Sequence, residues 1–169
     1  MKLSTSLTAQ AEQLLAACRA NKIKIATAES CTGGLIAGCL TAVAGSSDVV
    51  ERGFVTYSNE AKSEMLSVPA ELILRVGAVS EEVSRAMAEG ALAHSRAGLS
   101  VAVTGVAGPG GGTAEKPVGL VHLSCARHGG ITRHERHIYA GDRDAVRLAT
   151  VETALDMALD AVKSHTAQA

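Results

Sequence analysis

The feature that most constrains the fold is a short, almost wholly apolar segment that runs directly into a glycine-dense one. Residues 99–103, Leu-Ser-Val-Ala-Val, are typical of a central strand buried on both faces. Residues 104–112 follow with five glycines in nine positions, and so many glycines cannot form a core element. The junction predicts a buried strand that opens at its carboxyl end into a loop, which is where α/β proteins bind ligands.

Helical and strand patterns alternate along the rest of the chain. We expect helices at 6–21 and 35–43, from a cap at Asn59 through 62–66, after Pro69, from Ser80 until Gly98 stops it, and after a cap at Asp142. We expect further strands at 23–28, 53–57, 118–126 and 131–139, the last two forming a hairpin with the final strand at the sheet edge. This order predicts one domain over residues 1–169, a three-layer α/β/α sandwich with a mixed, mostly parallel sheet of about five strands.

Small side chains dominate the apolar content, because only Phe54, Tyr57 and Tyr139 are aromatic. A core of this kind needs close backbone packing, and 47% hydrophobic residues exclude a disordered chain. The 16 basic and 17 acidic residues are interspersed, so we expect no nucleic-acid partner. With neither a signal segment nor a long apolar stretch, we expect a cytoplasmic protein with no membrane contact.

Metal and disulfide chemistry are not indicated by the cysteines and histidines. Cys18, Cys31, Cys39 and Cys125 form no Cys-x-x-Cys pair and are typical of small core residues. His134 and His137 are three residues apart, which places them on opposite faces of a strand. We therefore expect neither a metal nor a cofactor.

Ser30 is the candidate nucleophile. It lies just after a predicted strand and before a helix opened by Gly33 and Gly34. Free backbone N–H groups and the helix dipole at that point favour developing negative charge. The alternative is an ordinary helix-capping serine.

Lys62 is the candidate base, because a lysine in the first turn of a helix faces the positive end of the dipole, which lowers its pKa. A neutral lysine can deprotonate a serine, as in Ser-Lys hydrolases. Tyr57 ends its strand nearby and suits a proton relay or a stacking partner. The alternatives are a solvated surface lysine and a rim tyrosine.

The glycine loop and two arginines suggest an anion site. The loop lacks the Gly-Lys-Ser/Thr of a phosphate-binding P-loop and is followed by a hairpin instead of a dinucleotide-binding helix. Arg143 and Arg147 lie one turn apart at the start of the last helix, where cations oppose the dipole unless they hold an anion. Pairing with Asp142 or Asp144 is the alternative for the arginines, and a flexible lead-in to the hairpin is the alternative for the loop.

Several ordered motifs resemble one known family. They are Thr-Ala-Glu-Ser-Cys-Thr-Gly-Gly at 27–34, Gly-Phe-Val-Thr-Tyr-Ser-Asn-Glu-Ala-Lys at 53–62, Gly-Ala-Val-Ser at 77–80, Gly-Val-Ala-Gly-Pro-Gly-Gly-Gly at 105–112, Lys-Pro-Val-Gly at 116–119 and Gly-Asp-Arg at 141–143. From about residue 8 to 162 the chain resembles the CinA C-terminal domain family. Its stand-alone members, the form expected here, are nicotinamide-nucleotide amidohydrolases.

The resemblance implies hydrolysis of the carboxamide of nicotinamide mononucleotide in pyridine-nucleotide salvage, without a metal, by a homodimer or higher oligomer. It also implies site residues. Ser30 is the expected nucleophile, Lys62 its base and Tyr57 a relay or pocket wall, with Ser46 and Ser47 as rival nucleophiles. The expected substrate contacts are Thr104 and Gly105 at the oxyanion or amide, and Thr32, Gly33, Ser47, Gly108, Gly110, Gly111, Gly112, Arg143 and Arg147 elsewhere. A non-catalytic nucleotide-binding or regulatory module is the alternative.

Overall fold

A five-stranded mixed sheet with helices on both faces forms the protein. The structure, a computed structural model, describes residues 4–166. Its strands are β1 (Ile25–Glu29), β2 (Val50–Val55), β3 (Leu99–Gly105), β4 (Leu120–Arg127) and β5 (Arg133–Ile138). Their order is β2-β1-β3-β4-β5, with β2, β1 and β3 parallel and β4 antiparallel to both β3 and β5.

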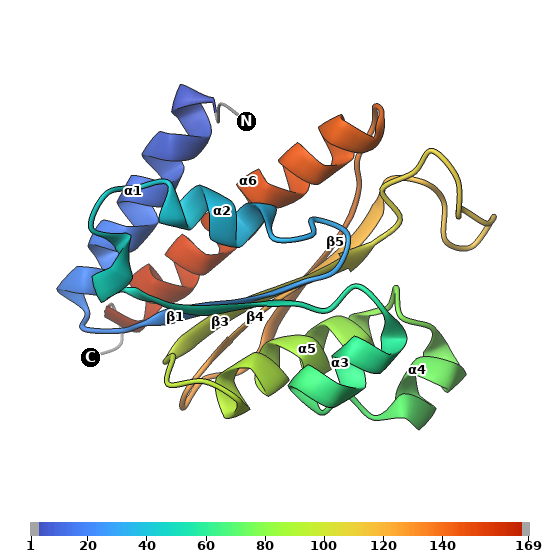
Figure 1. Cartoon of the computed structure of the whole chain (residues 1–169), viewed down its shortest axis with the longest axis horizontal. Coiled ribbons are helices and arrows are strands. Elements are labelled where there is room, and N and C mark those ends of the chain that lie inside the picture. Colours follow the sequence, from blue (N-terminus) through green and yellow to red (C-terminus); the bar gives the residue numbers. More distant parts are fainter. Residues whose placement is uncertain (1–3, 167–169) are drawn as a thin grey trace.

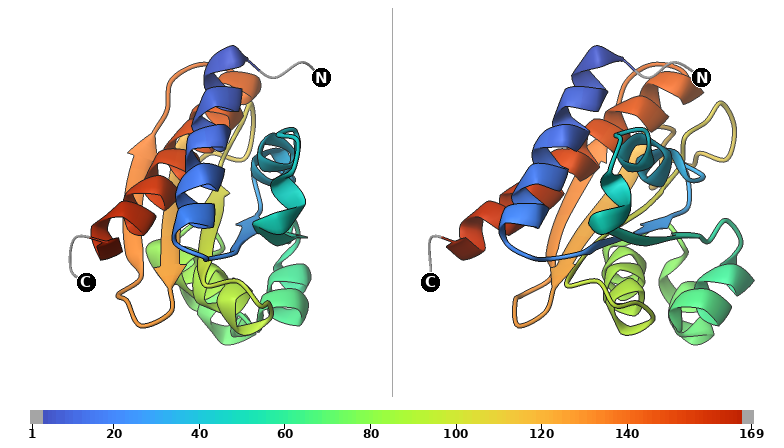
Figure 2. Two further views of the ribbon diagram at one scale, coloured as in Figure 1. Left: turned by 90° about the vertical axis from the view of Figure 1, so that its left-hand side faces the viewer. Right: turned by 60° about the vertical axis from the view of Figure 1, so that its left-hand side comes forward.

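The helices lie in two layers (Figures 1 and 2). They are α1 (Thr5–Ala20), α2 (Leu35–Thr41), α3 (Asn59–Leu66), α4 (Ala70–Val76), α5 (Glu81–Ala93) and α6 (Arg143–Thr166), with a 3₁₀ turn η1 (Ser46–Asp48). One face of the sheet carries α1, α2 and α6, and the other carries α3, α4 and α5. The expected three-layer sandwich with a mixed five-stranded sheet is confirmed.

Small residues allow these layers to pack closely. The buried side chains form two clusters, one on each face of the sheet. Where α5 crosses α3, a Cβ added to Gly90 would stand 2.1 Å from the carbonyl oxygen of Leu66. The backbones meet there because Gly90 has no side chain, which is the kind of contact that a core with few rings needs.

Some predicted boundaries are wrong. The strand expected at 53–57 is β2, which starts at Val50, opposite Ile25 of β1, and ends before Tyr57. The first three residues of β2 were missed because the charged Glu51 and Arg52 break the apolar pattern. In the structure these two side chains form an ion pair on the edge strand. The first strand is 25–29 instead of 23–28, and the hairpin strands are 120–127 and 133–138.

Helix ends also differ from the predicted ones. The second helix ends at Thr41, and the helix expected to run to Gly98 ends at Ala93. Ser58 caps α3 in place of Asn59, since its Oγ accepts a hydrogen bond from the Ala61 amide at 3.0 Å. The Asp142 cap of α6 is confirmed, because its Oδ1 accepts from the Ala145 amide at 2.9 Å.

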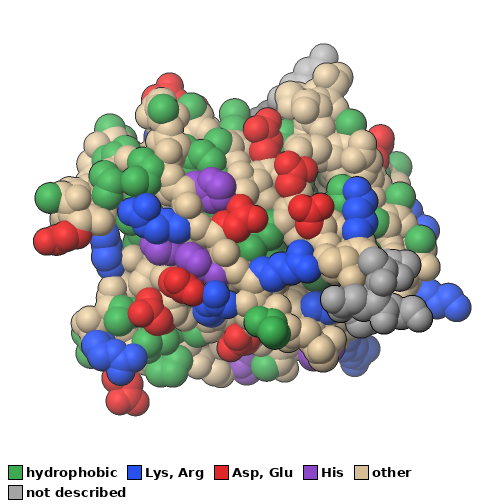
Figure 3. Space-filling view, turned by 180° about the vertical axis from the view of Figure 1, so that it is seen from behind, with side chains coloured by type: hydrophobic (Ala, Val, Ile, Leu, Met, Phe, Trp, Pro, Cys, Tyr) green, Lys and Arg blue, Asp and Glu red, His purple; other side chains and the backbone are tan. Residues whose placement is uncertain are grey.

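The edge strand β5 is polar, as expected. Its sequence, Arg-His-Glu-Arg-His-Ile, leaves most side chains exposed or half-buried. Seen from behind the view of Figure 1, the surface carries basic, acidic and histidine side chains intermixed (Figure 3). Within residues 4–166, no helix has the length and hydropathy needed to cross a membrane.

Candidate active site

The three parallel strands end at the same edge of the sheet, the one formed by their carboxyl ends, and bring the predicted site residues there. Glu29 ends β1, Val55 ends β2 and Gly105 ends β3, and the register pairs Glu29 with both Val55 and Val103. Hydrogen bonds from Arg143 and Arg147, in the first turns of α6, join the N-terminal end of that helix to the loops that follow these strands. The expected convergence of segments far apart in the sequence is therefore present.

Ser30 and Lys62 are in direct contact. The Nζ of Lys62 lies 3.1 Å from the Oγ of Ser30, 2.9 Å from the carbonyl oxygen of Thr56 and 3.5 Å from that of Ser58. An amine whose two hydrogens go to the two carbonyls directs its remaining position at the serine hydroxyl. In the charged form that position donates to Ser30, and in the neutral form it accepts the serine proton.

Lys62 is almost fully buried, with 1% of its surface exposed, so it is not the solvated surface lysine that the sequence left open. Burial lowers its pKa below the ordinary value of 10.5. The direction agrees with the expectation, but its first cause is loss of water instead of the helix dipole. The neighbouring Cys31 thiol is no rival nucleophile, because burial raises its pKa to about 12.

Glu29 is a buried carboxylate that the sequence analysis left without a role. It is 0% exposed, and its oxygens accept hydrogen bonds from the amides of Gly34, Ile36 and Ala37 at 2.8–3.1 Å. These three amides at the start of α2 are therefore occupied, and an oxyanion site on other N–H groups beside Ser30 stays a prediction. The available signal was a carboxylate that closes an otherwise apolar strand, Ile-Ala-Thr-Ala-Glu.

Tyr57, Arg143 and the glycine loop form a second cluster at the same edge. One Arg143 nitrogen donates to the Tyr57 hydroxyl at 2.9 Å and another donates to the Gly108 carbonyl at 2.9 Å. Tyr57 is 60% exposed. Arg143 has no ion pair among the residues that the structure describes, so its charge is available to an anionic ligand.

Arg147 lies against the turn that follows Ser30. Its Nη2 donates to the Thr32 carbonyl at 3.1 Å and stands 3.8 Å from where a Cβ of Gly33 would be. Its nearest carboxylate, Asp144, is 3.8 Å away, and its buried Nε has no hydrogen-bond partner in the described chain. The arginine pair is therefore only weakly neutralised by its own helix.

The other predicted contacts are placed as follows. The hydroxyls of Thr32 and Thr104 are buried and donate to Glu29 at 2.6 Å and to the Ala78 carbonyl at 2.9 Å. Both are engaged within the protein, so a direct role toward a substrate stays a prediction. Gly105 packs against β4, since an added Cβ would stand 2.7 Å from the Leu120 carbonyl oxygen. The exposed glycines of the loop are Gly110, Gly111 and Gly112.

Ser46 and Ser47 lie at the opposite end of the parallel strands, where β1 and β2 begin. They belong to η1, which precedes β2, and β2 begins opposite Ile25, the first residue of β1. Four residues of strand therefore separate this turn from Glu29, about 13 Å at the usual rise. The structure does not bring Ser46 or Ser47, the two rivals of Ser30 for the nucleophile role, to the candidate site of the same chain.

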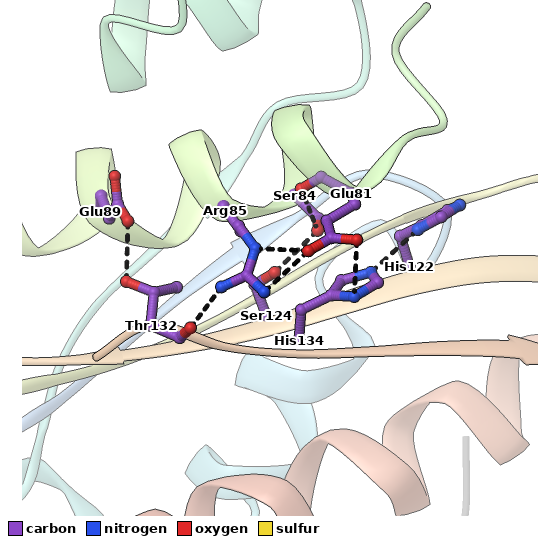
Figure 4. A network of polar contacts seen from close by, with 8 residues as sticks. All are labelled: Glu81, Ser84, Arg85, Glu89, His122, Ser124, Thr132 and His134. Carbon is purple, nitrogen blue, oxygen red and sulfur yellow. Dashed lines mark hydrogen bonds and ion pairs between the residues drawn. The ribbon is translucent and has the colours of Figure 1, made fainter. Parts of the chain in front are cut away.

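A histidine network lies between α5 and the hairpin of β4 and β5 (Figure 4). His122 Nδ1 is 2.9 Å from His134 Nε2, and His134 Nδ1 is 3.4 Å from Glu81 Oε2. The 2.9 Å contact between the rings needs a hydrogen on one of the two facing nitrogens and none on the other, so at least one ring is neutral while it forms. Burial lowers the pKa of both rings, that of His122 to about 4.

The site as a whole offers a serine beside a buried amine and two arginines that can take an anion. Within residues 4–166, no group of three or more histidine, cysteine or acidic side chains is arranged to hold a metal. All four cysteines are buried and unpaired. The chemistry this geometry supports is nucleophilic attack by Ser30 on a substrate with a negatively charged group.

Comparisons with known proteins agree with the resemblance found in the sequence. The family model described as the CinA C-terminal domain matches residues 7–162. A CinA-like protein of Akkermansia muciniphila is 57% identical over 139 residues, which cover 82% of this chain but 34% of that protein. This chain therefore spans about a third of the length of its CinA-like relatives.

Shorter relatives match over nearly their full length. The nicotinamide-nucleotide amidohydrolase PncC of Escherichia coli is 51% identical over 146 residues, covering 85% of this chain and 87% of that protein. Among solved structures, the competence/damage inducible protein CihA from Agrobacterium tumefaciens has a TM-score of 0.92 at 51% identity, covering 96% of this chain and 99% of that one.

Proposed function

Because the chain belongs to the CinA C-terminal domain family, we propose that it hydrolyses the carboxamide of nicotinamide mononucleotide to nicotinate mononucleotide and ammonia. The proposal makes it a metal-independent Ser/Lys amidase of cytoplasmic pyridine-nucleotide salvage. The observation that carries it is the 3.1 Å contact between Ser30 Oγ and the buried Lys62 Nζ, in a chain 51% identical to a nicotinamide-nucleotide amidohydrolase.

Lys62 acts as base and then as acid in the proposed mechanism. Neutral Lys62 takes the Ser30 proton while Oγ attacks the carboxamide carbon, and it then gives that proton to the departing nitrogen, so that ammonia leaves. An ester to Ser30 remains. Lys62 then deprotonates a water molecule that attacks the ester, and it returns that proton to Ser30 Oγ as the bond to the acid product breaks. The lowered pKa of Lys62 supports this cycle, because only the neutral amine can accept a proton.

Arg143 and Arg147 bind the substrate phosphate in this proposal, and the loop around Gly108–Gly112 holds the ribose. Tyr57 is the expected stacking partner for the pyridine ring. Phe54 is buried in the core and the Tyr139 hydroxyl donates to Thr153 at 2.6 Å, so neither competes for that role within its own chain.

The remaining predicted contacts act mainly through the backbone. The Thr32 carbonyl accepts a hydrogen bond from Arg147, and Gly33, which has no side chain, leaves room for the guanidinium group beside it. Thr104 holds the segment before α5 through the Ala78 carbonyl. Contact of Thr104 or Gly105 with the reacting amide stays a prediction, as does assembly into a homodimer or higher oligomer.

Ammonia release tests the proposal. Purified protein is incubated with nicotinamide mononucleotide, with and without a chelator, beside the variants Ser30→Ala and Lys62→Met. We expect equal release by the wild type in both conditions and none above background from either variant. Absence of release by the wild type overturns the proposed reaction, and nucleotide binding without turnover supports a non-catalytic module. Full activity of Lys62→Met removes the lysine from the mechanism.

A further inference from the structure

Glu29 connects the two halves of the Ser30–Lys62 pair. On one side, its backbone carbonyl accepts a hydrogen bond from the Thr56 amide at 2.8 Å, and the Thr56 carbonyl in turn accepts from Lys62 Nζ at 2.9 Å. On the other side, Ser30 follows Glu29 directly. Glu29 therefore contacts Thr56, which accepts a hydrogen bond from Lys62, and is also joined directly to Ser30 in the chain.

The Glu29 side chain fixes the turn that carries the serine. Its Oε2 accepts from the Thr32 hydroxyl at 2.6 Å and from the Gly34 amide at 3.1 Å, so residues 30–34 wrap around their own carboxylate. The Ser30 amide donates to the Val103 carbonyl, and its carbonyl accepts from the Gly33 amide. The serine backbone is thus held from both directions.

The carboxylate has no charged partner in the described part of the chain. Its two oxygens accept five hydrogen bonds, three from the first amides of α2 and two from the hydroxyls of Thr27 and Thr32. A fully buried carboxylate is costly unless its lone pairs are filled. Here they are filled by three amides at the start of α2, the seven-residue helix after the serine turn, and by the two threonine hydroxyls.

We propose that Glu29 is a positioning residue, whose buried carboxylate holds the turn 30–34 so that Ser30 Oγ faces Lys62 Nζ. The inference rests on the proposed function for its substrate but not for its geometry. Glu29 itself does not reach the substrate, because it is 0% exposed. Its main effect is on the rate of the step that uses Ser30, and a smaller effect on binding is expected through Arg147, which donates to the Thr32 carbonyl of the same turn.

Glu29→Gln is the main test. Glutamine keeps the shape, but either orientation of its amide turns an NH₂ group against a backbone N–H of α2 that the carboxylate accepted. The serine turn should shift, and a misplacement of about 1 Å can cost about a hundredfold in rate. We expect that loss in kcat with at most a severalfold rise in KM, which comes through Arg147 on the Thr32 carbonyl. We also expect a changed pH profile of kcat/KM, because the environment of Lys62 changes with the turn.

Thr32→Val provides a second variant if Glu29→Gln folds poorly, since it removes only the 2.6 Å bond and keeps the shape. We expect a smaller loss in kcat of the same kind, and a smaller loss still for Thr32→Ser, which retains the hydroxyl. Glu12→Gln, an exposed change on α1, controls for the loss of one negative charge. Circular dichroism and urea unfolding give the folded fraction to which each rate is referred.

Labelling of Ser30 separates this inference from the proposed function. A fluorophosphonate reacts with an activated serine, which forms an O–P bond as fluoride leaves and the proton passes to Lys62. Intact mass gives the labelling rate without any substrate. Slower labelling of folded Glu29→Gln than of wild type and Glu12→Gln supports the inference even if nicotinamide mononucleotide is not hydrolysed. Equal labelling rates and equal kcat values overturn it.

Discussion

Acid should destabilise the protein through the buried histidine pair. The pKa of His122 is about 4 in the folded protein, against an ordinary value of 6.5, chiefly because the ring is buried and next because His134 lies against it. Arg136 and Lys116 also disfavour its charged form, while Glu81 favours it. An unfolded chain regains the ordinary pKa, so between these values only the unfolded state takes up the proton.

The sign and size follow from this difference. Stability from the neutral ring is fully present above pH 6.5 and is lost as the pH falls toward 4, because the folded pKa is the lower one. Each pKa unit corresponds to about 1.4 kcal/mol, so His122 alone accounts for about 3 kcal/mol over that interval. The pKa of His134 is lowered as well, which acts in the same direction.

Urea unfolding at about pH 7 and about pH 4, followed by circular dichroism, measures this loss as a difference in the free energy of unfolding. The double variant His122→Phe/His134→Phe keeps two stacked rings, whose centroids are 5.2 Å apart in the wild type, and removes both titrating groups. Its free energy of unfolding should fall by at least about 3 kcal/mol less on acidification than that of the wild type, because His134 adds to the effect of His122. His128→Gln, in the exposed hairpin turn, should behave as the wild type does. An equally steep loss in the double variant would refute the reasoning.

Three further outcomes are expected. Arg143→Ala should raise KM for the nucleotide with little change in kcat, and Arg143→Lys should recover only part of the affinity because the planar fork is lost; steady-state kinetics checks both. The rise of kcat/KM with pH should have its midpoint below 10.5, since burial lowers the pKa of Lys62, and a pH–rate profile that rises only above that value would contradict it. Gly90→Ala should lower the free energy of unfolding by about 1–3 kcal/mol, because the new methyl group crowds the Leu66 carbonyl. Gly38→Ala, in α2 with open space around it, should leave that free energy unchanged or raise it by up to about 1 kcal/mol. Thermal unfolding of the two glycine variants distinguishes these signs.

The layer architecture could be predicted because hydrophobic period and turn residues decide it. The buried strand β3, the hairpin and the polar edge strand each carried a pattern that depends only on local sequence. Boundaries were missed where a tertiary contact overrides the pattern. The start of β2 is fixed by pairing with Ile25 in spite of Glu51 and Arg52, and no period in the sequence contains that information.

The sequence predicted which residues form the candidate site better than it predicted their burial and hydrogen-bond partners. Lys62 belongs to the polar helix sequence Asn-Glu-Ala-Lys-Ser-Glu-Met-Leu, and its burial arises only when the ends of β1 and β2 meet over it. Four of the five partners of Glu29 lie in the turn after β1 and at the start of α2, and they reach the carboxylate only through the path that this turn takes. The position of Ser47 away from the site could have been predicted, because the helix after a parallel strand returns the chain to the end of the sheet where the strands begin.

The scarcity of rings also determines how this protein can be observed. The chain has no tryptophan and two tyrosines, so its ultraviolet emission comes from two phenols with different surroundings. Tyr139 is packed against the core and α6, whereas Tyr57 stands exposed beside Arg143. In a Tyr139→Phe protein all tyrosine emission comes from Tyr57, at the candidate site. Arrival of a nucleotide there can then be followed by intrinsic fluorescence, with no dye attached.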